Sequence, residues 1–270
     1  MDIHKRLPTA IVLLFLAFVT IQYAPDWVYF GVIQLLILAA LWELYKLIWG
    51  KEHLAEKIMG TIIALNISFS FYFLNWPLEI AFFSSLLILG IYFVFSINRN
   101  EKLTWFPQNI AIVFFGAFYL SFTLNFFNLI RKDHGPYPVY FLLAVIFIGD
   151  TGAFLVGRLI GKHKMAPIAS PRKTWEGSFG GILLAVATGG AMQIFFLRGD
   201  ALLWKSLLLA FLIHIVAQIS DPLESLFKRA VGVKDSSNIL PGHGGFLDRL
   251  DSLILASPFF YFLLKYIGFL

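Results

Sequence analysis

The residues best suited to chemistry lie between positions 221 and 251, where charged and glycine residues interrupt an apolar sequence. Four of them are spaced i, i+3, i+4 and i+7, and these are Asp221, Glu224, Ser225 and Lys228. On a helix, side chains with this spacing share one face. That face would carry two carboxylates, a hydroxyl and an ammonium. Such charge beside hydrocarbon is costly, so the pattern indicates a functional site.

A second acidic pair, Asp248 and Asp251, repeats the i, i+3 spacing at the predicted start of the last helix. The helix dipole also favours acidic residues in a first turn, so capping is the alternative role for Asp248. Residues 241–245, with the sequence PGHGG, separate the two acidic groups. Glycines allow positive φ and close backbone approach, and such a loop can present its amides to a phosphate.

Asp150 lies far upstream, inside an apolar stretch. A carboxylate there indicates a functional site, with a hydrogen bond between helices as the alternative. The aspartates offer oxygen ligands and the chain has no cysteine, a combination that suits Mg²⁺. Asp150 could assist in binding this ion or hold a second cation. Carboxylate-held Mg²⁺ beside Arg and Lys is what phosphoryl or nucleotidyl transfer needs. The predicted metal ligands are Asp150, Asp221, Asp248 and Asp251.

Segment 170–174, with the sequence SPRKT, is a second predicted phosphate site. Pro171 predicts a turn rather than a continued helix. The next helix begins near Glu176, and helix N-termini favour anions. Arg172 can bind a phosphate through two hydrogen bonds, and Lys173 can act as a point charge. Ordinary basic residues of a cytoplasmic loop are the alternative reading.

The candidate residues fall into two functional groups. The predicted catalytic residues are Asp221, Lys228, Arg229, Asp248 and Asp251. Substrate or phosphate contacts are predicted for Ser170, Arg172, Lys173, Thr174, Glu224, Ser225, Lys234, Asp235, His243, Gly244, Gly245 and Arg249. Ser225 has no adjacent His base, so a hydrogen-bonding role is favoured over nucleophilic attack. For His214 a buried polar contact is favoured over a proton relay, and Glu43 is similarly ambiguous.

The elements that must position these residues are membrane helices. The chain has 270 residues, of which 59% are hydrophobic and only 14% charged, and this composition excludes a soluble fold. A membrane helix needs about 20 mostly apolar residues. The sequence predicts an all-α polytopic membrane protein in one domain, 1–270, with N-terminal helices in 1–135 and catalytic helices and loops in 136–270. The nine predicted spans are 7–24, 27–49, 58–75, 77–97, 108–130, 137–160, 177–197, 201–227 and 252–269.

The distribution of basic residues predicts the orientation. Sixteen of the 21 Lys and Arg residues fall on the side of the N-terminus and five on the other side. By the positive-inside rule, the N-terminus and the charged loops face the cytoplasm, and the protein belongs in the cytoplasmic (inner) membrane. The net charge of +5 suits an anionic membrane surface or anionic substrates. It does not indicate nucleic-acid binding, because the basic residues lie in short loops.

Small residues recur every four positions along the sixth predicted span, at Gly149, Ala153, Gly157 and Gly161. Such a stripe lets a second helix approach closely. This pattern is structural, and it does not indicate a cofactor loop.

Taken together, these motifs resemble the phosphatidate cytidylyltransferase family. The resemblance rests on the SLFKR motif that starts at Ser225, the LPGHGGFLDRLD motif that ends at Asp251, the DT-x-AF motif at Asp150, and SPRKT-x-EG in 170–177. It covers roughly residues 145–257, whereas the first five spans agree only in being hydrophobic. Ser220 departs from the family, which usually has Gly before the Asp that corresponds to Asp221. We expect the backbone to tolerate Ser220, although its side chain could crowd the metal site.

The resemblance implies that CTP and phosphatidic acid give CDP-diacylglycerol and pyrophosphate by direct in-line attack. The choice of cytidine and of the lipid comes from the resemblance, because the residues alone do not indicate which nucleotide base is bound. The alternatives are a CTP-dependent polyprenol kinase, a cytidylyltransferase for ether lipids, and a transporter of phosphorylated solutes. No internal repeat of the kind found in transporters is visible, and the polar residues gather at one membrane face. The sequence leaves room for a homodimer.

Overall fold

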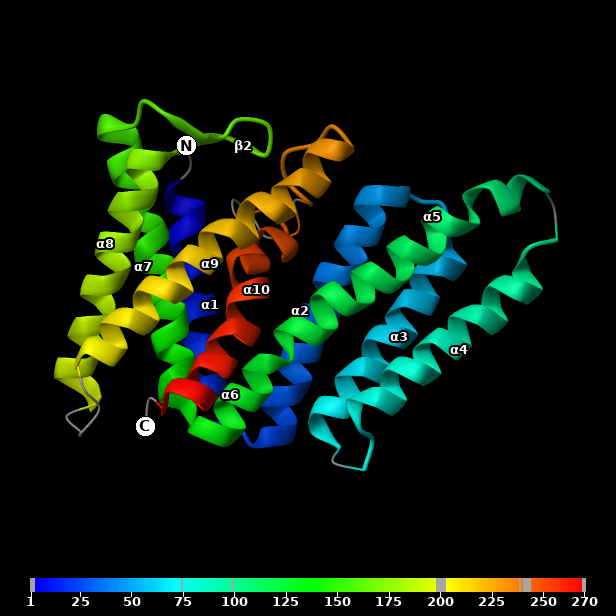
Figure 1. The fold of residues 1–270 in the computed structure, drawn as a ribbon, viewed down its shortest axis with the longest axis horizontal. Coiled ribbons are helices and arrows are strands. Elements are labelled where there is room, and N and C mark those ends of the chain that lie inside the picture. The colour runs from blue at the N-terminus through cyan, green and yellow to red at the C-terminus, as the bar shows by residue number, and fades with distance from the viewer. Residues whose placement is uncertain are drawn as a thin grey trace. The chain divides into compact units, whose positions relative to one another are not determined.

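The protein is built almost entirely from helices (Figure 1). A computed structural model describes residues 3–73, 75–98, 100–197, 203–237, 239 and 244–268. The helices are α1 (Ile3–Tyr23), α2 (Asp26–Trp49), α3 (Leu54–Tyr72), α4 (Leu78–Ser96), α5 (Asn100–Ala117), α6 (Phe126–His134), α7 (Pro136–Ile160), α8 (Trp175–Met192), α9 (Leu203–Ala230) and α10 (Leu247–Leu263). Short π-helical turns are η1 (Phe118–Phe122), η2 (Gln193–Leu197) and η3 (Leu264–Gly268).

Eight helical segments in the described part of the chain are long and apolar enough to cross a membrane, from Asp26–Trp49 to Leu247–Ile267. They coincide with eight of the nine predicted spans and confirm the all-α polytopic membrane fold. The remaining predicted span, 7–24, falls on α1, whose described apolar part is Ile11–Tyr23. The count of nine and the cytoplasmic N-terminus stay predictions.

The fifth span is longer than the sequence predicts, because α5, η1 and α6 follow one another through Leu103–His134. Buried polar groups in this span find partners on α3. The Ser121 hydroxyl donates to the carbonyl of Ala64 at 2.7 Å, and the Asn125 amide donates to the Ser68 hydroxyl at 2.9 Å. Satisfying such groups internally is required where lipid offers no partner.

The chain packs as two compact units, each of which is described on its own. The first unit comprises Met1–Asn128 and Ser236–Leu247. The second comprises Leu129–Asp235 and Asp248–Leu270, and it therefore contains α7, α8, α9 and most of α10. Segment 236–247, which joins α9 to α10 along the chain, belongs to the first unit.

Within the second unit, α7 and α8 pack backbone to backbone through small residues. A Cβ added to Gly177 of α8 would lie 2.7 Å from the carbonyl oxygen of Ala153 and 3.1 Å from the Cα of Gly157. Only a glycine fits at that distance, and the predicted small-residue stripe of α7 is thereby confirmed. The contact holds the start of α8 against the C-terminal half of α7.

A two-stranded antiparallel hairpin joins α7 to α8, with β1 at Lys164–Ala166 and β2 at Ser170–Thr174. The sequence predicts a turn at 170–174, and the structure forms a strand there because its backbone pairs with β1. The register sets Lys164 opposite Thr174 and Ala166 opposite Ser170. Pro171 is compatible with this arrangement, because a two-stranded hairpin leaves a free edge on each strand.

Two side chains fix the hairpin to the start of α8. The hydroxyl of Thr174 caps the helix by accepting from the backbone N–H of Gly177 at 3.2 Å. The carboxylate of Glu176 accepts from the backbone N–H of Lys162 at 3.1 Å and from that of His163 at 3.2 Å. Both ends of the hairpin are therefore held at one helix N-terminus.

The close packing of α7 on α8 predicts the effect of adding one methyl group. Gly177→Ala should destabilise the protein by about 1–3 kcal/mol, because the new Cβ overlaps the backbone of α7. Thermal unfolding in detergent measures the effect. Gly90→Ala in α4 is the matched control, since a Cβ there meets nothing within 4 Å. Equal melting temperatures for the two variants would contradict the prediction.

Candidate active site

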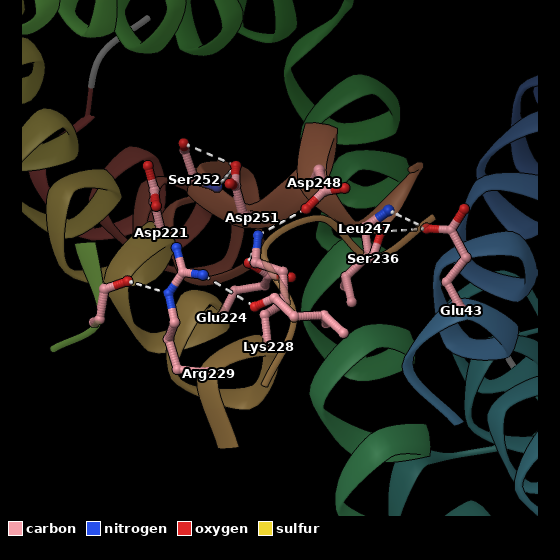
Figure 2. A network of polar contacts seen from close by, with 12 residues as sticks. Glu43, Asp221, Glu224, Lys228, Arg229, Ser236, Leu247, Asp248, Asp251 and Ser252 are labelled. Carbon is pink, nitrogen blue, oxygen red and sulfur yellow. Dashed lines mark hydrogen bonds and ion pairs between the residues drawn. The ribbon is translucent and has the colours of Figure 1, made fainter. Parts of the chain in front are cut away.

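The second unit contains a buried cluster of charges centred on Lys228 (Figure 2). The Lys228 Nζ lies 2.5 Å from a carboxylate oxygen of Glu224 and 2.7 Å from one of Asp248. The exposed fraction of the side chain is 7% for Lys228, 0% for Glu224 and 8% for Asp248. Two carboxylates thus share one ammonium, which leaves the group with an unbalanced negative charge away from water.

Helix geometry explains why these residues meet. The α9 helix continues to Ala230 although it contains Pro222, so Asp221, Glu224 and Lys228 share one face as predicted. Asp248 is in the first turn of α10. The predicted capping role and the ion pair with Lys228 are compatible, because a first-turn carboxylate is also favoured by the helix dipole.

Asp221 is paired with the hairpin. Its carboxylate lies 2.7 Å from the Nζ of Lys173 in β2, and both side chains are about a quarter exposed. The hairpin therefore delivers a cation to the acidic face of α9, and residues 48 positions apart come into contact. This ion pair is the most accessible part of the cluster.

Ser252 connects the two remaining aspartates. Its hydroxyl lies 3.3 Å from a carboxylate oxygen of Asp150 in α7 and 3.2 Å from one of Asp251 in α10, and it can donate to either. The backbone N–H of Ser252 also donates to Asp251 at 2.7 Å. Ser252 therefore joins Asp150 of α7 to Asp251 of α10.

Ser220 links α9 to α10 at the position of Asp251. Its hydroxyl donates to the backbone carbonyl of Asp251 and accepts from the backbone N–H of Leu255 at 3.2 Å. Those two backbone groups are four residues apart and lie on one face of α10. The hydroxyl therefore bridges α9 to the backbone of α10, and its side chain is directed at that backbone rather than at the carboxylates.

Arg229 makes structural contacts in addition to carrying charge. Its guanidinium donates to the carbonyl of Ala169, in the hairpin, at 3.4 Å and to the carbonyl of Val233 at 3.0 Å (Figure 2). It therefore ties the end of α9 to the hairpin. A guanidinium has five N–H donors, so two carbonyl contacts leave capacity for an anion.

The other predicted substrate contacts are distributed as follows. Ser225 is buried on α9, Ser170 is half-buried in β2, and Thr174 serves as the helix cap described above. Gly244 has a φ of 82°, as the glycine-rich loop predicts, and Gly245 is buried. His243 lies outside the described residues. The exposed members are Arg172, Lys234, Asp235 and Arg249.

The carboxylates suit a hard cation in chemistry. Within the described ranges, no group of three or more His, Cys, Asp or Glu residues is placed to hold a metal ion. Instead, lysine ammoniums occupy positions beside Asp221 and Asp248. Asp150, Asp221 and Asp251 come from three helices and carry the oxygen ligands that hard divalent cations prefer. The residue types therefore suit a divalent cation.

Sequence reasoning missed Ser252 and the pair of Gln218 and Ser178, which support the site. Ser252 was overlooked because a lone serine in an apolar helix carries no signal of its own. Gln218 of α9 donates to the carbonyl of Ser178 of α8 at 3.1 Å and accepts from its hydroxyl. The signal available for Gln218 is a polar amide inside an apolar span, since such groups pair with a neighbouring helix.

The fold and the cluster agree with a family assignment. The Cytidylyltransferase family matches residues 4–267, which is nearly the whole chain, and the chain therefore belongs to this family. The match includes the first five spans, for which the motifs alone show only hydrophobicity.

Individual relatives carry a more specific name. The phosphatidate cytidylyltransferase of Staphylococcus haemolyticus (strain JCSC1435) is 40% identical over 171 residues, which are 63% of this chain and 63% of the relative. That of Bacillus subtilis (strain 168) is 36% identical over 189 residues, 69% of this chain and 68% of the relative. That of Brucella suis biovar 1 (strain 1330) is 43% identical over 148 residues, 54% of each. The chain matches less than two thirds of the length of the first of these relatives.

Removing the central ammonium should destabilise the fold. Lys228→Met leaves Glu224 and Asp248 buried without a counterion, which should cost about 3–5 kcal/mol. Thermal unfolding of the detergent-solubilised protein measures the loss. Lys162→Met, at an exposed position, is the control and should change stability by less than about 0.5 kcal/mol. A Lys228→Met protein that melts with the wild type would show that the triad is not a stabilising unit.

Ser220 should be replaceable at moderate cost. Ser220→Ala removes the hydroxyl that bridges α9 and α10, so we expect a loss of about 1 kcal/mol. Amide hydrogen exchange at Leu255, read beside thermal unfolding, reports on this contact directly, because the Leu255 N–H loses an acceptor. Ser257→Ala, elsewhere in α10, is the control. Faster exchange at Leu255 is expected in the first variant alone, and equal exchange in both would refute the bridging role.

Proposed function

We propose that the protein is a phosphatidate cytidylyltransferase that converts CTP and phosphatidic acid to CDP-diacylglycerol and pyrophosphate. The observation that carries the proposal is the cluster of Asp150, Asp221, Asp248 and Asp251 with Lys173 and Lys228, which holds both signs of charge on membrane helices. Family membership and the names of the relatives support the choice of nucleotide and lipid.

In the proposed reaction a phosphate oxygen of phosphatidic acid attacks the α-phosphorus of CTP. A new P–O bond forms there, the bond from the α-phosphorus to the bridging oxygen of the β-phosphate breaks, and pyrophosphate leaves with the electron pair. No covalent intermediate with the protein is needed, because positioning and electrostatics can carry such a transfer.

Specific residues are assigned to each part of this transfer. Asp221, Asp248 and Asp251 would hold a divalent cation, which we propose is Mg²⁺, and Asp150 would assist them. The bound ion would neutralise charge that develops on the transferred phosphate. Basic residues would hold the phosphates of CTP and lipid, namely Lys228, Arg229, Lys234, Arg172 and Lys173. Ser225 would donate a hydrogen bond.

The membrane setting fits two substrates of different solubility. We propose that the site faces the cytoplasm from the cytoplasmic (inner) membrane, because the basic loops gather on that side. Phosphatidic acid would reach the cluster from the leaflet and CTP from the water phase. The exposed ion pair of Lys173 and Asp221 marks the part of the cluster that a soluble nucleotide can reach first.

Pyrophosphate release tests the proposal. Purified protein with Mg²⁺ should release pyrophosphate only when CTP and phosphatidic acid are both present, and not with ATP, GTP or UTP. Asp221→Asn and Asp251→Asn should each lower kcat by at least about a hundredfold, since each removes a charged ligand of the cation that would neutralise the transferred phosphate. Asp133→Asn, which loses only a contact with Tyr261, is the control.

One result would refute this function, namely turnover with a phosphate-free polyprenol in place of phosphatidic acid, which would identify a CTP-dependent kinase. Full activity of a folded Asp221→Asn or Asp251→Asn variant would instead show that the residue is not a key ligand of the cation. Chelation of divalent cations should abolish release, and activity that persists without them would exclude the proposed ligand role.

A further inference from the structure

Glu43 lies in the last third of α2 with 2% of its surface exposed. Its carboxylate accepts hydrogen bonds from Ser236 and Leu247 (Figure 2) and also from Ser237. The hydroxyl of Ser236 donates at 2.9 Å and that of Ser237 at 2.7 Å. The backbone N–H of Leu247 donates at 2.9 Å. All of these residues belong to the first unit.

The three donors bracket segment 236–247 at both of its ends. Ser236 and Ser237 begin the segment, and Leu247 ends it. Leu247 is also the first residue of α10, whose opening N–H groups have no partner within the helix. A carboxylate at such an N-terminus is favoured by the helix dipole as well as by hydrogen bonding.

Gly245 gives an independent sign that this contact is built into the fold. A Cβ at Gly245 would lie 2.3 Å from a carboxylate oxygen of Glu43 and 2.0 Å from the hydroxyl of Ser236. A Cβ there would push aside the Glu43 carboxylate or the Ser236 hydroxyl that bonds to it, whereas glycine lets the backbone pass close to both. The glycine at this position therefore accommodates the contact between Glu43 and Ser236.

The peptide chain connects this anchor to the residues of the candidate active site. Segment 236–247 is bonded to Asp235 at one end and to Asp248 at the other. Asp248 follows Leu247 directly, so fixing the N–H of Leu247 fixes the turn of α10 from which the Asp248 side chain projects toward Lys228. A buried carboxylate in a membrane span is expensive, and three hydrogen bonds to one loop give a reason for it.

We propose that Glu43 is a positioning residue for the reaction. Its carboxylate anchors Ser236, Ser237 and Leu247 and sets the start of α10, so that Asp248 is held in position for the reaction. This inference rests on the proposed function for its catalytic consequence. The anchoring itself concerns only the first unit and can be measured without substrate.

A spin label reports on the anchor. The chain has no cysteine, so Ile239→Cys creates a unique attachment point at an exposed position of the segment. In electron paramagnetic resonance spectra, Glu43→Ala should raise the mobility of this label, because all three donors lose their acceptor. Glu43→Gln should keep the label ordered, because the amide oxygen still accepts and the Ser237 hydroxyl can turn to accept from the amide N–H. Gln34→Leu, which removes another buried polar group from α2, is the control.

Kinetics test the consequence for the reaction. Glu43→Ala should lower kcat/KM for CTP by about ten- to a hundredfold, as is usual when the support of a first ligand is lost. Glu43→Gln should restore most of this loss, and Gln34→Leu should leave kcat/KM within about twofold. The double variant Ser236→Ala with Ser237→Ala removes two donors while keeping the carboxylate, and it takes the place of Glu43→Ala if that variant does not fold.

The outcomes separate this inference from the proposed function. An ordered label and normal kcat/KM in folded Glu43→Ala, or in the double serine variant, would overturn the inference. A loss of activity in Gln34→Leu equal to that in Glu43→Ala would overturn it too, since both would then act through stability. If the label is released in Glu43→Ala but the wild type shows no activity with CTP and phosphatidic acid, the anchor stands and the proposed function fails.

Discussion

The pairing of Lys228 with two buried carboxylates is the interaction on which the second unit depends. One ammonium holds Glu224 of its own helix and Asp248 of α10, and all three side chains are almost fully shielded from water. Such a group stabilises little by itself, because burial costs about as much as the attraction returns. The triad instead restricts how α9 packs on α10, because separating the two helices would leave Asp248 without its ammonium.

The remaining charges follow from the same constraint. Each predicted catalytic carboxylate has a partner. Asp221 pairs with Lys173 of the hairpin, and Asp248 pairs with Lys228 of α9. Asp251 accepts from Ser252 within α10. The glycine contact between α7 and α8 places the hairpin, and Thr174 and Glu176 fix it to the start of α8. Lipid-facing helices thereby hold a polar site without exposing backbone groups to hydrocarbon.

Residue pattern predicted the helices and the acidic face of α9, because hydropathy and i, i+3, i+4 spacing are local properties. It did not predict the strand at Ser170–Thr174, since pairing with β1 depends on partners four to ten residues away rather than on intrinsic preference. The sequence also could not predict which groups the single serines contact. Ser252 and Ser220 act through helices that come together only in the fold, and Ser220 contacts the backbone of α10 instead of crowding the carboxylates.

The division of the chain into interleaved units has a consequence for the order of assembly. Leu247 and Glu43, which are joined by a hydrogen bond, stand 204 residues apart in sequence. Synthesis proceeds from the N-terminus, and early helices can pack before later ones emerge. The first unit nevertheless waits for segment 236–247, so it is completed only after α9 has left the ribosome. A truncated chain that lacks α9 and α10 would therefore keep the Glu43 carboxylate but lose segment 236–247, which donates its hydrogen bonds.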